Sequence, residues 1–161
     1  MTKIEARLEA LGLILPAALQ IPAGLVLPFP WVSVRGTRVF ISGHGAQETD
    51  GSLARPLGQV GAEVSVAQAK ELARKVGLSI LGSLKRELGD LDRITGWGKA
   101  LGMVNSAPGF ADQPAVINGF SELILEVFGP AVGRHARSAV GMAGLLFGMA
   151  VEIEAEVLIA G

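Results

Sequence analysis

The sequence contains no cysteine and no tyrosine, and its aromatic residues are two tryptophans and six phenylalanines. Without cysteine the chain has no disulfides and no thiolate chemistry, which is compatible with a reducing compartment. With so few aromatic side chains, a platform on which nucleic-acid bases stack is not expected. These absences favour a cytoplasmic location and do not favour a nucleic-acid partner.

Charge is also scarce, at 18% of residues against about 25% in an average domain. Fourteen basic and fifteen acidic residues give a net charge of −1, without the basic excess of a nucleic-acid binder. The chain is 50% hydrophobic, and its 161 residues correspond to a single domain, residues 1–161. Such a domain is either a well-buried monomer or, as we favour, an oligomer with a large apolar interface.

One uncharged segment, from Ala10 to Val34, is long enough to cross a bilayer. It is interrupted by Pro16, Pro22, Pro28 and Pro30, each of which lacks the backbone donor that a continuous helix needs. The charges before it alternate in sign, whereas a signal peptide carries net positive charge there. We therefore expect extended, buried chain with turns, and no membrane span.

Hydrophobic periodicity predicts an α+β fold, in which two helices cover one side of a sheet. The expected helices are residues 2–11, 65–88 and 112–128, and the expected strands are residues 31–34, 38–42, 94–104, 139–142 and 149–159. The chain from Ser42 to Gly45 is expected to be a loop, and Gly77 to mark close packing of its helix against the sheet. Residues 1–30 form an N-terminal extension with a short helix.

Carboxylates on the last strand are the first candidate for chemistry. Glu152, Glu154 and Glu156 alternate with apolar residues, so they project from one face about 7 Å apart. They are either a solvated face or, where water is scarce, groups that raise one another's pKa. In the second case one of them can act as a general acid or base, or hold a water.

A lone arginine, Arg137, is the second candidate. At a strand end beside a cleft, its guanidinium can bind a carboxylate through two parallel hydrogen bonds; the alternative is an ordinary surface arginine. The histidines, His44 and His135, are isolated in sequence, so no metal cluster is indicated. No phosphate-binding loop and no nucleophile elbow occurs, and we expect neither metal nor cofactor.

Four separated stretches together resemble the RidA/YjgF family. Two of them resemble its C-terminal signature: an arginine followed by a short apolar strand (residues 137–140), and the VEIEA strand (residues 151–155). The fifteen-residue gap from Arg137 to Glu152 also agrees with the family spacing. Residues 41–43 resemble the family's Ser-Gly step, and residues 116–118 its helix asparagine. The resemblance extends from about residue 32 to residue 159, and the longer N-terminus suggests a divergent branch.

The resemblance implies a chorismate-mutase-like sheet with two helices on one face, assembled as a homotrimer with clefts between subunits. It implies a small carboxylate metabolite as partner. Arg137 would bind the carboxylate of a 2-imino or enamine acid, and Glu152 would hold the water that hydrolyses the imine to a 2-keto acid and ammonia. Positioning and one proton transfer suffice for this reaction without a metal.

The resemblance also assigns the remaining pocket residues. Ser42, Gly43 and Asn118 would line the pocket, and the Ala139 carbonyl would be a second contact for the water. Trp31 stands where the family often has an aromatic hydroxyl, so that hydrogen bond would be absent.

Two other functions fit the same family. A regulatory member would bind a small carboxylate without turnover, and other members are labelled endoribonucleases, a function that the near-neutral charge does little to support.

Overall fold

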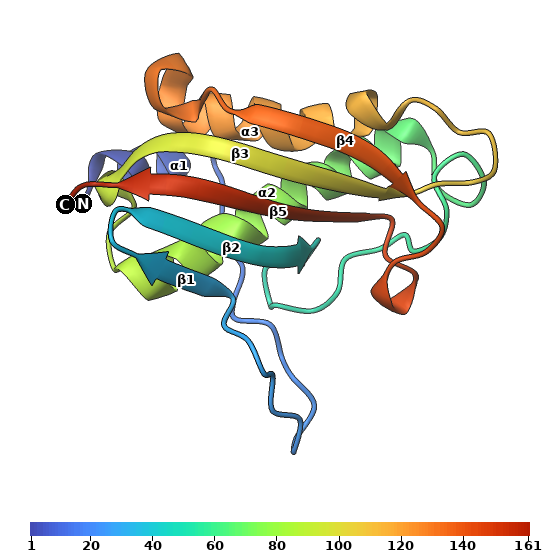
Figure 1. Ribbon diagram of the computed structural model, residues 1–161, viewed down its shortest axis with the longest axis horizontal. Helices are drawn as coiled ribbons and strands as arrows, with labels where there is room; N and C mark the ends of the chain where they lie inside the picture. Colours follow the sequence, from blue (N-terminus) through green and yellow to red (C-terminus); the bar gives the residue numbers. More distant parts are fainter.

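The computed structural model describes residues 1–161 and contains one five-stranded sheet in the order β1-β2-β5-β3-β4 (Figure 1). The strands are β1 (Val32–Arg35), β2 (Arg38–Gly45), β3 (Ile94–Asn105), β4 (Ala136–Met142) and β5 (Val151–Ile159). Neighbouring strands are antiparallel except β3 and β4, which are parallel. The sheet is therefore mixed, with β5 at its centre and β1 and β4 at its two edges.

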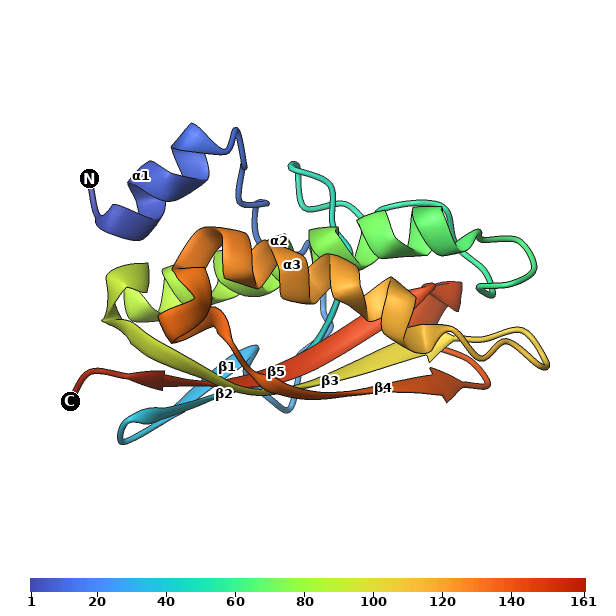
Figure 2. The same ribbon diagram turned by 90° about the horizontal axis from the view of Figure 1, so that it is seen from above.

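Helices cover only one face of this sheet (Figure 2). They are α2 (Val66–Leu88) and α3 (Gln113–Gly133), while α1 (Lys3–Ala10) lies on their outer side. Two short 3-10 helices, η1 (Leu91–Arg93) and η2 (Leu146–Gly148), precede β3 and β5. The expected α+β fold with two helices on one face of the sheet is confirmed.

The core lies between the sheet and these two helices. Every second residue of β5 is buried against the helices, and the glutamates between them point to the other face. The buried residues are Val151, Ile153, Ala155, Val157 and Ile159. The prediction that Gly77 of α2 packs closely against the sheet is wrong. A Cβ there would lie 2.6 Å from Leu123 and 3.3 Å from Phe120, so the close packing is between α2 and α3.

Two apolar segments bear on membrane association. By length and composition alone α3 could span a bilayer, but side chains along it, such as Phe120 and Ile124, are fully buried in the core. The uncharged segment from Ala10 to Val34 contains no helix after α1 ends. The expected extended chain with turns is confirmed there, but the expected burial is wrong, because side chains such as Leu25 and Val26 are 57% and 85% exposed. Helix α3 continues to Gly133 instead of ending at residue 128, because Pro130 starts a further turn after the non-helical Gly129.

Strand boundaries differ from the sequence prediction at three places. The expected loop from Ser42 to Gly45 is wrong, because β2 continues through it to Gly45 with a shift in register between Ile41 and His44. Strand β4 begins three residues earlier than expected, and β5 begins two residues later. Strand β3 has two register shifts opposite β5, which mark β-bulges.

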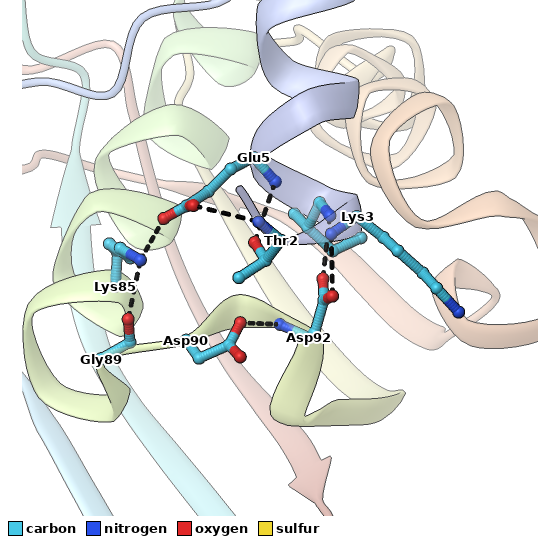
Figure 3. Close-up of polar contacts among 8 residues, drawn as sticks. Thr2, Lys3, Glu5, Lys85, Gly89, Asp90 and Asp92 are labelled. Atoms are coloured by element: carbon cyan, nitrogen blue, oxygen red, sulfur yellow. Dashed lines mark hydrogen bonds and ion pairs between the residues drawn. The ribbon is translucent and has the colours of Figure 1, made fainter.

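Polar contacts attach α1 to the rest of the domain (Figure 3). Thr2 and Glu5 form a capping box, and Glu5 also forms an ion pair with Lys85 of α2. The carboxylate of Asp92 accepts hydrogen bonds of 2.8 Å from the backbone N–H groups of Lys3 and Ile4, at the helix N-terminus. The N-terminal extension thus begins as an anchored helix.

Candidate functional site

The predicted site residues fall into two groups, and the first lies at the β4 edge of the sheet. Arg137 is the second residue of β4, and its side chain points to the helix-covered face. Its guanidinium donates to the Ser121 hydroxyl of α3 at 3.0 Å and to the Pro114 carbonyl at 3.2 Å. No ion pair holds Arg137, so its charge is available to an anion.

A short polar chain continues from this arginine. The Ser121 hydroxyl accepts from Arg137 and lies 2.9 Å from Nε2 of His135, whose Nδ1 lies 2.8 Å from the carbonyl of Gly133. A carbonyl only accepts, so Nδ1 carries the proton and Nε2 accepts from Ser121. Arg137, Ser121 and His135 line a groove of about 250 Å³ together with Arg134 and Leu125. The groove has two arginines and no carboxylate.

Asn118 and Ala139 belong to the same edge. Asn118 is four residues after Pro114 and three before Ser121, so it shares the helix face that Arg137 contacts. Ala139 is two residues after Arg137 on the same face of β4 and packs against the core. Three of the predicted residues, Arg137, Asn118 and Ala139, therefore lie together.

The second group surrounds Glu152 on β5. This side chain is half-buried, and its carboxyl has a pKa raised above 4.5. Burial is the larger cause, and the negative charge of the neighbouring Glu154 is the smaller one. Gly43 of β2 comes so close that a Cβ there would overlap Oε1 of Glu152 and lie 3.1 Å from its Cδ. Of the other glutamates on this face, Glu156 is paired with Arg38 at 2.6 Å and Glu154 is exposed. Only Glu152 combines partial burial with a raised pKa, as a proton-transferring carboxyl needs.

Ser42 and Trp31 complete this group. The Ser42 hydroxyl donates to the carbonyl of Pro30 at 2.8 Å, and its backbone N–H donates to the carbonyl of Trp31 at 3.0 Å. The Trp31 ring packs against the ring of His44, with centroids 5.2 Å apart. Trp31 thus holds the start of β1 against the end of β2.

A cavity of about 310 Å³ opens where β2 extends past the start of β1. Its lining contains Glu152, Gly43, Trp31 and His44, together with Ser83 and Arg86 of α2, residues 18–20 and 22 of the N-terminal arm and the apolar residues Leu53, Phe147 and Met149. Sequence reasoning missed Ser83 and Arg86. In the sequence, Arg86 lies outside the apolar stripe of α2, but so does every surface residue of that helix, and this position alone does not indicate a site.

Hydrogen bonds connect the polar residues of this cavity. Nδ1 of His44 lies 2.6 Å from the Ser42 carbonyl, and Nε2 lies 2.8 Å from the Ser83 hydroxyl. Arg86 donates to the same hydroxyl at 3.1 Å and to the carbonyl of Pro16 at 3.1 Å. Burial lowers the pKa of His44 below 6.5, so its imidazole is neutral at pH 7.

Within one chain the two groups do not meet. Arg137 points to the helix-covered face from the edge strand β4, whereas Glu152 points to the opposite face from the central strand β5. Two strand spacings, about 10 Å, separate β4 from β5, and Arg137 is level with Ala155, three residues along β5 from Glu152. Each group is therefore half of the predicted site.

Comparison with known proteins agrees with the family that the sequence motifs resemble. The family model described as "YjgF/chorismate mutase-like, putative endoribonuclease" matches residues 5–145. The chain belongs to the YjgF family. The match contains Arg137, Asn118, Ser42 and Gly43, and β5 with Glu152 follows it.

Similar YjgF-family proteins come from distant organisms. The protein TCP17 of Trypanosoma cruzi is 41% identical over 153 residues, which are 95% of this chain and 92% of TCP17. The crystal structure of Atu1372 from Agrobacterium tumefaciens, of unknown function, is 42% identical with a TM-score of 0.85, covering 98% of this chain and 93% of that one. A structure from Shewanella oneidensis, titled a "putative endoribonuclease", is 27% identical with a TM-score of 0.87, covering 98% and 100%. The N-terminal extension is within the matched length in each case, so this longer form of the family recurs.

Proposed function

We propose that this YjgF-family protein hydrolyses small 2-imino or enamine acids to 2-keto acids and ammonia, in clefts between the subunits of a cytoplasmic homotrimer. The observation that carries the proposal is the pair of complementary half-sites. One offers an arginine without a carboxylate partner, and the other offers a carboxyl with a raised pKa beside a cavity. A carboxylate-bearing imine needs both.

The reaction uses Glu152 as the proton carrier. The carboxylate takes a proton from a water whose oxygen adds to the imine carbon, and passes that proton to the imine nitrogen, which becomes an amine. The same carboxylate then carries the proton of the new hydroxyl to this amine, so that the carbon–nitrogen bond breaks, ammonia leaves and the keto group forms. A carboxyl whose pKa lies above its usual value performs both proton transfers better than an ordinary surface glutamate does.

Arg137 supplies substrate binding in this proposal. Ser121 and Pro114 orient its guanidinium with neutral acceptors, which leaves its positive charge uncompensated for a ligand carboxylate. Asn118 lies on the same helix face and contributes an amide beside it. Holding the substrate in place accounts for most of the acceleration, because imines hydrolyse readily once water is positioned.

A trimer would bring the half-sites together. The helix-free face of the sheet carries exposed apolar side chains, with Phe40 39% and Leu158 42% exposed, and Leu101, Met103 and Val140 are only partly buried. Exposed apolar surface of this kind is typical of a subunit interface. In an assembly with cyclic symmetry, Arg137 of one subunit would face Glu152 of the next.

Ammonia release from freshly generated 2-aminoacrylate tests the proposal. We expect the wild type to exceed the spontaneous rate, and Arg137→Ala and Glu152→Gln each to return it to that rate. The matched control is Arg35→Ala, because Arg35 is exposed at the end of β1 and lines neither the groove nor the cavity. A wild-type rate equal to the spontaneous rate would refute the proposal for this substrate.

A second candidate function is capture of a small carboxylate without turnover. It is favoured by Trp31, which provides no hydroxyl where the family often has one. A melting temperature that rises with 2-oxobutyrate, without ammonia release from the imine, would support this candidate.

The endoribonuclease function is favoured only by the family description and by the name given to the Shewanella oneidensis structure. It requires RNA cleavage that survives further purification and is lost in Glu152→Gln.

A further inference from the structure

We propose that Arg86 is a second anion-binding residue of the cavity beside Glu152, so that the preferred ligands are dicarboxylates: 2-imino and 2-keto acids with a distal carboxylate. This inference rests on the proposed function, in which Arg137 of a neighbouring subunit binds the first carboxylate. The resemblance to the family assigns no role to Arg86, Ser83 or His44.

The charge inside the cavity is the first argument. Arg86 and Glu152 are the only lining residues with a full charge at neutral pH, since His44 is neutral there. A ligand group that approaches Glu152 is neutral or positively charged, as an imine nitrogen is. A ligand group that approaches Arg86 is an anion.

The bonding of Arg86 is the second argument. Its guanidinium contacts two neutral acceptors, the Pro16 carbonyl and the Ser83 hydroxyl, and takes part in none of the chain's five ion pairs. These two bonds use two of its five N–H donors and fix its direction. Partial burial without an opposite charge lowers the pKa of this guanidinium, which is the situation that a bound carboxylate relieves.

The position of Arg86 is built into the fold. Gly82, one turn earlier on α2, leaves room for the guanidinium, since a Cβ there would lie 3.3 Å from Nη1 of Arg86 and 3.2 Å from the Pro16 carbonyl. Beyond that carbonyl the arm is held by the Ala17 N–H, which donates to Thr49 at 3.0 Å. Arg86 therefore fixes the N-terminal arm that forms one wall of the cavity. The N-terminal extension thus helps to form the site.

The size and lining of the cavity fit a short dicarboxylate. Its volume of about 310 Å³ is at the lower end of small-molecule sites, which span about 300–1,000 Å³. Leu53, Met149 and Trp31 provide an apolar wall for the carbon chain between the two charged ends. A monocarboxylate such as 2-oxobutyrate would leave Arg86 without a partner.

Calorimetric titration of the full-length protein with 2-oxobutyrate and 2-oxoglutarate tests the inference. We expect 2-oxoglutarate to bind the wild type at least about tenfold more tightly, because a hydrogen-bonded charge pair contributes about one to two powers of ten in affinity. Arg86→Met should lower 2-oxoglutarate affinity about 10- to 100-fold and 2-oxobutyrate affinity by a much smaller factor, so that the preference for the dicarboxylate is lost. Arg86→Lys keeps the positive charge but cannot bind a carboxylate through two parallel hydrogen bonds, so it should retain part of the preference for 2-oxoglutarate.

Controls separate this inference from the proposed function. Arg35→Met should change neither affinity, and thermal melts should show that each variant is folded. Equal affinities of the wild type for the two ligands, or a preference that survives in Arg86→Met, would overturn the role of Arg86. If both ligands still require Arg137 in that case, the proposed function stands. If neither ligand binds the wild type, both proposals fail.

Discussion

The close approach of Gly43 to Glu152 gives a quantitative prediction for Gly43→Ala. An added Cβ would overlap Oε1 of Glu152 and lie 3.1 Å from Cδ and 3.3 Å from Cγ. Nonbonded carbon atoms pack at about 3.5–4.0 Å, so the carboxylate must move by about 1 Å. A misplacement of that size costs about a hundredfold in rate, so imine hydrolysis should fall about a hundredfold in Gly43→Ala.

The assay is ammonia release from 2-aminoacrylate, corrected for the spontaneous rate. Gly96→Ala is the matched control, because a Cβ at this strand glycine would have one neighbour, at 4.0 Å, and its rate should equal that of the wild type. The double variant Gly43→Ala, Glu152→Gln should be no slower than Glu152→Gln alone, since both changes act on one carboxyl. A Gly43→Ala variant with full activity would refute the reasoning that this glycine positions Glu152.

Three further predictions concern stability. Glu152→Gln should raise the free energy of unfolding at pH 7, because a raised pKa means that the folded state disfavours the ionised carboxylate; the gain should vanish below pH 4.5, measured by urea titration at both pH values. The wild type should lose stability as pH falls below 6.5, because the buried His44 has a lowered pKa and resists protonation, and this loss should be smaller in His44→Gln. Gly119→Ala should destabilise the fold by about 1–3 kcal/mol in the same urea assay, since its Cβ would overlap the Lys70 carbonyl between α2 and α3.

Local patterns allowed most of the fold to be predicted. The alternation of β5 requires only one buried face, and it held from Val151 to Ile159. The capping box at Ser65 and Gln68 involves residues three apart, and both of its hydrogen bonds form. Where the prediction failed, longer-range pairing decided the outcome: the chain from Ser42 to Gly45 looks like a loop, yet pairing with β5 holds it in β2.

The candidate site was predicted only in part, for a similar reason. The motifs identified Arg137 and Glu152 but could not show that the two side chains lie on opposite faces of one sheet. Arg86 and Ser83 enter the cavity because α2 crosses beside β2 and because the N-terminal arm returns to Pro16. The contact of Arg86 with Pro16 joins residues 70 positions apart and that of Ser83 with His44 joins residues 39 apart, and no local pattern encodes them.

Subunit complementation tests most directly whether the two half-sites act together. Arg137→Ala and Glu152→Gln chains, each inactive alone, would be co-expressed with different tags, and mixed oligomers would be purified and assayed for ammonia release. If each site takes its arginine from one subunit and its glutamate from the next, every mixed trimer has one intact site of its three. We predict about a third of wild-type activity for the purified mixed trimers. Mixed oligomers that stay at the spontaneous rate, or a protein that remains monomeric, would contradict the account.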